Sequence, residues 1–60
     1  MTKVLWTPTR NTEREAQRKH GDVWDLRKAE AFQGHASLLI ESEDGMDLRW
    51  VKVEQANLLT

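Results

Sequence analysis

Residues 36–53 read ASLLIESEDGMDLRWVKV, with an apolar run on each side of Asp44-Gly45. Asp-Gly is a preferred pair for a tight β-hairpin turn, whose two central residues both adopt positive φ. A loop of two or of four residues gives the same strand register. The sequence therefore predicts a β-hairpin with eight opposed pairs: Ser42–Asp47, Ile40–Arg49, Leu38–Val51, Ala36–Val53, Glu43–Met46, Glu41–Leu48, Leu39–Trp50 and Ser37–Lys52.

This register divides the apolar side chains of the hairpin between two faces, because opposed residues share a face. The first face holds the apolar residues away from the turn: Ala36, Leu38, Ile40, Val51 and Val53. The second holds those that run toward the turn: Leu39, Trp50, Leu48 and Met46. A hairpin with one wet face would alternate apolar and polar residues. We therefore expect either a sharply bent hairpin that serves two parts of a core or a contact surface on the second face.

The N-terminal third predicts a short strand and a helix. Residues 3–6 form a short apolar-rich strand that ends before Pro8, because the residue preceding a proline is restricted to extended conformations. Thr12 and Glu15 have the spacing of a capping box, which predicts a helix over residues 12–20. Its only apolar side chain is Ala16, so the helix is expected either to dock through that residue and through aliphatic stems or to be partly frayed.

A further strand is predicted between this helix and the hairpin. Residues 23–27 are strand-like, with Trp24 and Leu26 on one side. The following residues are expected to extend that strand as far as a loop at Gln33-Gly34. Together these elements predict a mainly β domain spanning residues 1–60, with four to five short strands closing as a small open barrel over residues 21–59.

The barrel segment resembles an SH3-like small barrel and, more loosely, the KOW class of these barrels. Four short stretches carry the resemblance: Gly21-Asp22-Val23, Gly34-His35-Ala36 leading into Leu38 and Ile40, Trp50-Val51-Lys52-Val53-Glu54, and Ala56-Asn57-Leu58. The segment before Gly34 lacks the basic, glycine-flanked loop of KOW barrels. No RNA or ribosome contact of that class is therefore carried over to this chain.

Composition restricts the classes of function. The chain has 60 residues, no cysteine and a net charge of −1, so disulfides and thiolate metal sites are excluded. No stretch approaches the roughly 20 apolar residues of a membrane span, and we expect a cytoplasmic protein without a membrane partner. Residues 1–21 carry five basic and two acidic side chains, whereas residues 22–60 carry four basic and eight acidic ones.

Signals for catalysis and for cofactors are poor. Ser37 and Ser42 lie inside a predicted strand, without the strand-to-helix elbow of a nucleophile. His20 and His35 have no further ligand at metal-binding spacing, and the helix end predicts a surface position for His20. A chain this short has little room for the about 300 Å³ that small-molecule pockets usually need. We expect no enzyme, no cofactor, no metal site and no small-molecule substrate.

The three tryptophans are the most informative side chains. A buried tryptophan removes about 150–250 Å² from water, and core positions are expected for Trp24 and for at least one other. Trp50 is the candidate for a contact surface, because tryptophan is frequent among interface hot spots. The predicted protein-binding patch consists of Trp50, Leu39, Leu48 and Met46.

The leading hypothesis is a non-catalytic accessory domain that binds another protein or a second copy of itself. The alternative is a nucleic-acid-binding barrel whose basic helix contacts phosphates through Arg10, Arg14, Arg18 and Lys19. Basic residues that share a surface with exposed aromatic residues would favour nucleic acid, and wide separation would favour protein. A structural subunit of a larger particle, such as a phage or ribosome-associated assembly, is the third hypothesis.

Overall fold

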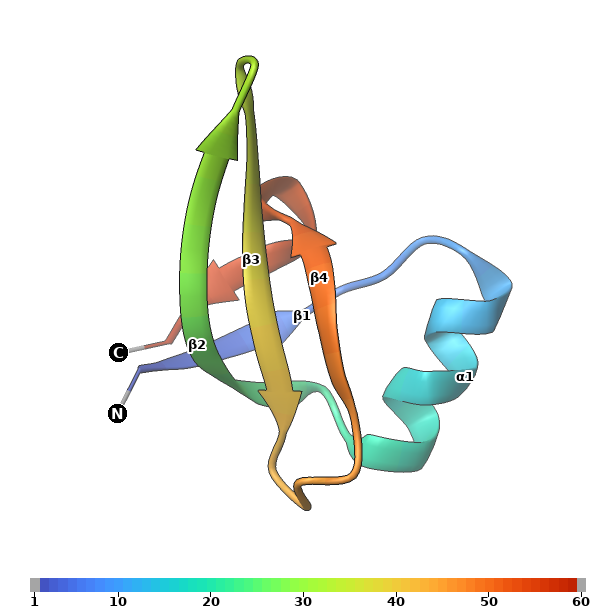
Figure 1. The fold of residues 1–60 in the computed structure, drawn as a ribbon. Coiled ribbons are helices and arrows are strands. Elements are labelled where there is room, and N and C mark those ends of the chain that lie inside the picture. The colour runs from blue at the N-terminus through green and yellow to red at the C-terminus, as the bar shows by residue number, and fades with distance from the viewer. Residues whose placement is uncertain (1, 60) are drawn as a thin grey trace.

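A computed structural model describes residues 2–59, which form a five-stranded antiparallel sheet and one helix (Figure 1). In chain order the elements are β1 (Lys3–Trp6), α1 (Asn11–His20), β2 (Val23–Phe32), β3 (His35–Ser42), β4 (Leu48–Lys52), the 3-10 turn η1 (Val53–Gln55) and β5 (Ala56–Leu58). The strand order is β4-β3-β2-β1-β5, so β4 and β5 are the two edges. The mainly β fold with one N-terminal helix is confirmed, and the sheet is not closed into a barrel.

The β3–β4 hairpin has the register that the sequence predicts. The five opposed pairs are Ser37–Lys52, Leu38–Val51, Leu39–Trp50, Ile40–Arg49 and Glu41–Leu48. The Ser42 amide also donates to the Asp47 carbonyl over 2.9 Å. The predicted pair of Ala36 with Val53 is wrong, because the chain turns into η1 at Val53.

The two hairpin turns differ in a way that the sequence does not reveal. In the β3–β4 turn the Gly45 amide donates to the Ser42 carbonyl over 2.9 Å, and Gly45 has a φ of 75°. Asp44 does not have positive φ, so the prediction for both central residues is wrong. The predicted loop at Gln33-Gly34 is confirmed, and there both φ angles are positive, at 50° and 81°. That turn therefore has the backbone of a two-residue type I′ hairpin.

The core lies on one side of the sheet and contains two tryptophans. Its buried members are Val4, Trp6, Trp24, Leu38, Ile40 and Val51. The Trp6 and Trp24 rings meet edge to face, with centroids 5.0 Å apart. The prediction of core positions for Trp24 and one other tryptophan is confirmed. Ala36 and Val53, which were expected on the same face, are exposed, and the β2–β3 hairpin extends beyond the rest of the molecule (Figure 1).

Helix α1 starts one residue earlier than predicted, at Asn11. Arg10 is its N-cap and no side chain caps it, so the predicted capping box of Thr12 and Glu15 is wrong. The first helical hydrogen bond joins the Arg14 amide to the Arg10 carbonyl over 2.9 Å, which places Thr12 inside the first turn. In the part of the chain that the structure describes, no helix is long and apolar enough to cross a membrane.

Docking of α1 on the core through Ala16 is confirmed, and polar contacts add to it. The Gln17 side-chain amide donates to the Trp6 carbonyl over 2.8 Å. The His20 ring lies 2.9 Å from the Asp44 carboxylate and meets the Trp24 ring edge to face. His20 ends the helix as predicted, but its side chain is only 11% exposed, so it is more enclosed than the expected surface position. A helix without an apolar stripe is thus held by one alanine and by polar side chains that bond to the sheet and its loops.

Candidate functional site

The side of β2, β3 and β4 that points away from the core is the candidate site, here called the outer face. The strand registers set Leu39 between Lys28 and Trp50, and Ser37 between Glu30 and Lys52. Because directly opposed residues share a face, each of these rows projects to the same side. The outer face consists of Lys28, Glu30, Phe32, His35, Ser37, Leu39, Glu41, Leu48, Trp50 and Lys52.

The structure brings three of the four predicted patch residues together on this face. Leu39 and Trp50 are directly opposed, and Leu48 lies two residues from Trp50 along β4. Trp50 is 48% exposed and Leu48 is 57% exposed, whereas the other two tryptophans are fully buried. Met46 lies in the β3–β4 loop, two residues before the start of β4, and is also exposed. The second face of the hairpin therefore does not serve the core.

Sequence reasoning missed two side chains of the outer face, Phe32 and Glu30. Strict alternation from the core residues Trp24 and Leu26 would turn both toward the core. A bulge between Leu26 and Lys28 changes the phase of β2, so that Phe32 and Glu30 project outward. A signal was present in the sequence: the small apolar residues Ala29 and Ala31 are out of phase with Trp24 and Leu26.

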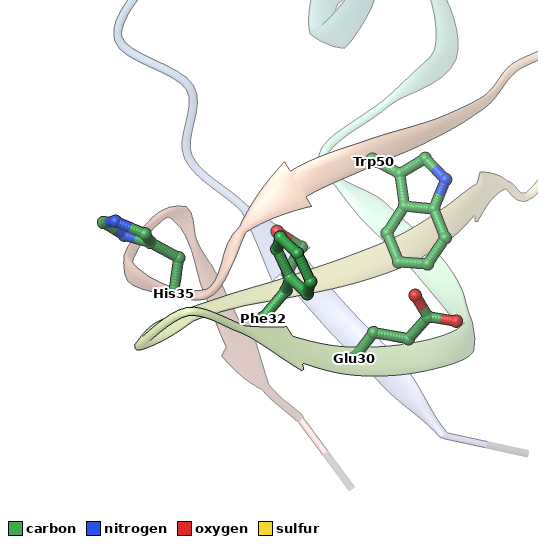
Figure 2. A pocket seen from close by; sticks show the side chains of 5 residues that line it. Glu30, Phe32, His35 and Trp50 are labelled. Carbon is green, nitrogen blue, oxygen red and sulfur yellow. The ribbon is translucent and has the colours of Figure 1, made fainter.

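A hollow of about 180 Å³ opens on the outer face between Phe32 and Trp50. Glu30, His35 and Ser37 complete its lining. Figure 2 shows the Glu30 carboxylate directed toward Trp50, whereas the His35 ring turns away from the two aromatic residues. Phe32 is 75% exposed and Trp50 is 48% exposed. The hollow is therefore bounded by two aromatic side chains that other protein atoms cover only in part. A carboxylate between aromatic walls is a setting that suits a positively charged group.

The charge of Glu30 is only loosely balanced within the chain. Its carboxylate lies 3.0 Å from the Lys28 ammonium, and both side chains are more than half exposed. Exposed ion pairs of this kind contribute about 0–1 kcal/mol, because water screens both charges. Farther along the face Arg27 pairs with Glu41. The Glu30 carboxylate is therefore accessible to a competing cation.

A second hollow, of about 210 Å³, lies on the other side of Trp50, beside the sheet edge formed by β4. Arg10 and Glu13 from the start of α1 face Trp50 and Lys52 across it. Of the predicted phosphate contacts, Arg10 thus shares a surface with an exposed aromatic side chain. The other three, Arg14, Arg18 and Lys19, are exposed on α1, and none of them lines either of these two hollows.

Two carboxyl groups with lowered pKa connect elements of the fold. The pKa of Asp44 is lowered because His20, the Ser42 hydroxyl and the Met46 amide all bond to its carboxylate. The pKa of Asp25 is lowered because the Lys3 ammonium lies 2.7 Å away. Asp44 fixes α1 to the β3–β4 loop, and Asp25 fixes β1 to β2.

Residues 2–59 do not contain three His, Asp or Glu side chains grouped as metal ligands. Ser42 is buried, and its hydroxyl is committed to Asp44 and to the Asp47 amide and carbonyl. His35 and Glu54 line a third hollow together with Lys52. The aromatic hollow is lined by a single carboxylate, that of Glu30.

Comparison with known proteins gives no relative: no protein-family model matches the chain, and no curated protein and no solved structure is significantly similar to it.

Proposed function

We propose that this chain is a small non-catalytic domain that binds another protein through its outer face, with Trp50 at the centre of the contact. The exposure of Trp50 among other apolar side chains carries the proposal. Phe32, Leu48 and Trp50 are all more than 45% exposed on one side of three adjacent strands. Contiguous apolar surface rimmed by charged residues commonly marks an interaction site.

The layout of this face resembles that of an interface. Trp50 has Leu39 beside it and a hollow on either side, into which side chains of a partner can insert. Charged residues lie around it: Lys28, Glu30, Glu41 and Lys52. A central aromatic anchor with a polar rim is the usual anatomy of a protein–protein contact. The three rigid strands also present the face without the entropy cost of ordering a loop.

We also propose that the fold is an SH3-like small barrel left open. The strand order β4-β3-β2-β1-β5, with a 3-10 turn between β4 and β5, supports this assignment. Helix α1 then occupies the connection between the first two strands. A fold of this kind hosts many unrelated functions, so it adds no partner to the proposal.

Selection from a random peptide display library tests the proposed function. Peptides enriched on the wild-type domain are titrated into labelled protein, and amide and indole NMR signals are recorded. The expected result is that Trp50 and neighbouring amides of β2–β4 shift, and that Trp50→Ser weakens binding at least about tenfold, as for an interface hot spot. Leu58→Ser is the matched control, because Leu58 is 66% exposed on β5, at the other edge of the sheet. Peptides that bind equally to Trp50→Ser would refute the proposed surface.

Nucleic-acid binding is the second candidate, favoured by one observation. Arg10 and Lys52 line the same hollow as Trp50, so two cations flank an exposed aromatic ring. A stacked base with two phosphate contacts would need this arrangement. Glu13 in that hollow and Glu30 and Glu41 on the outer face count against it. A mixed oligonucleotide pool titrated at low and physiological salt decides: salt-sensitive shifts of Trp50 that Arg10→Gln removes would favour nucleic acid.

A further inference from the structure

We infer that the hollow between Phe32 and Trp50 receives an arginine side chain of the protein partner, whose guanidinium pairs with Glu30. This inference rests on the proposed function and assigns the chemistry of the partner. The hollow combines two exposed aromatic side chains with one carboxylate directed toward Trp50 (Figure 2). Each of these groups attracts a cation, the rings through their quadrupoles and the carboxylate through its charge.

The size of the hollow fits one side chain of a partner better than a free small molecule. Its volume is about 180 Å³, below the about 300–1,000 Å³ of pockets that bury a small ligand. It is also open to solvent along the outer face, next to Leu39 and Trp50. A side chain that enters from a partner lying across β3 and β4 would fill it, while the partner covers the neighbouring apolar surface.

Arginine fits these groups better than lysine. Its guanidinium is planar, stacks on an aromatic face and can donate two hydrogen bonds to one carboxylate. The Trp50 ring supplies the face, and Glu30 supplies the carboxylate on the adjacent row of the same face. Lysine carries a more strongly hydrated point charge and gains less from stacking.

The ion pair of Glu30 within the chain is weak enough for an arginine of the partner to replace Lys28. Glu30 is paired only with the exposed Lys28 ammonium among the ion pairs of the described residues, and Lys28 can swing into water when another cation arrives. The outer face carries Lys28 and Lys52 as well as Glu30 and Glu41, so the attraction for an arginine comes from the nearby Glu30 carboxylate rather than from the charge of the whole face. Lys28 thus competes with the partner for Glu30, and its removal should strengthen binding.

Titration of labelled domain with a short capped peptide, Gly-Ser-Arg-Ser-Gly, tests the inference. The matched peptide carries citrulline, which keeps the shape of arginine and removes its charge. The expected result is a selective shift of the Trp50 indole and of the Glu30 and Phe32 amides, with millimolar affinity. The citrulline peptide should bind at least about fivefold more weakly, as expected for loss of a cation–π contact and an ion pair.

Three variants separate this inference from diffuse charge attraction. Glu30→Gln should weaken binding of the arginine peptide about three- to tenfold, and Lys28→Gln should strengthen it about two- to threefold. Glu15→Gln removes the same charge from an exposed position on α1 and should change nothing. Equal weakening by Glu30→Gln and Glu15→Gln overturns the inference, as do equal shifts with the citrulline peptide or no shift with either peptide.

The outcomes distinguish failure of this inference from failure of the proposed function. If library-selected peptides bind at Trp50 without arginine and without sensitivity to Glu30→Gln, the inference is wrong and the outer face remains a protein-binding surface. If no peptide of either kind shifts Trp50, both are wrong. A Trp50 indole that shifts on dilution of the domain alone would instead identify a second copy as the occupant, and would also overturn the inference.

Discussion

The inner and outer faces of the β3–β4 hairpin carry similar numbers of large apolar side chains but differ in how far those side chains are buried. On the inner face Leu38, Ile40 and Val51 are buried. On the outer face Leu48 and Trp50 are about half exposed, although both belong to the same short strand as Val51. The inner face is explained by folding, since its side chains pack around Trp6 and Trp24. The outer face has no such explanation within the described residues, and covering this face is the role of the partner proposed above.

The contrast is sharpest between two tryptophans. Trp24 is fully buried, packs against Trp6 and donates its indole N–H to the Gly21 carbonyl over 2.7 Å. Trp50 is 48% exposed and lines two hollows. A side chain of this size left in water is an apolar surface that a bound protein can cover.

The largest expected effect is the loss of folding on Trp24→Ala. Truncation of a buried tryptophan costs about 3–5 kcal/mol, which equals or exceeds the total stability of about 3–5 kcal/mol that a domain of this size usually has. Trp50→Ala should cost less than about 1 kcal/mol, because its surroundings are largely water. Urea unfolding followed by circular dichroism measures both. Similar losses for the two variants would break the comparison between the faces.

A smaller loss is expected for Asp44→Asn, which loosens α1 from the β3–β4 loop. The folded-state pKa of Asp44 is lowered, so its stabilising effect is present above the unfolded pKa of about 3.9 and is lost as the pH falls below that value. The difference in urea midpoint between wild type and Asp44→Asn should therefore be present above about pH 4 and should shrink as the pH falls below that value. The Lys3–Asp25 pair is lost over the same acidic range in both proteins and cancels from the difference. A pH-independent difference would contradict this role of Asp44.

The smallest effect is expected at the β2–β3 turn, which fixes the end of the outer face. Gln33 has a φ of 50°, a conformation that asparagine adopts more readily than glutamine. Gln33→Asn should raise the free energy of unfolding by about 0.5 kcal/mol while leaving peptide binding unchanged. Gly34→Ala should have the opposite effect, because φ is 81° there, and should cost about 1 kcal/mol. Stabilisation by both variants would argue against a type I′ turn.

The sequence predicts the inner face better than the outer one, for a physical reason. A buried row is specified by alternation over neighbouring strands, and the register of Leu38 with Val51 and of Ile40 with Arg49 follows from it. Trp50, Leu39 and Leu48 could be placed together by the same argument. Phe32 and Glu30 could not, because a single extra residue near Arg27 reverses the phase of β2.

Helix α1 shows a second limit of sequence reasoning. The spacing of Thr12 and Glu15 is a local signal for a capping box, but the helix starts at Asn11, so Thr12 lies inside the first turn and cannot cap it. The burial of His20 depends on Asp44, which lies 24 residues away and reaches it only through the folded hairpin. A pattern within one short segment of sequence cannot predict a contact between residues so far apart along the chain.

The most direct test of the central claim follows the three indole N–H signals while a library-selected peptide is added. Trp6 and Trp24 are buried and serve as internal references, whereas Trp50 lies on the proposed surface. The prediction is that the Trp50 indole signal moves with saturation while the other two stay nearly still. A Trp50 signal that stays fixed at peptide saturation, with backbone shifts confined to α1 or β5, would contradict the assignment of the outer face as the binding surface.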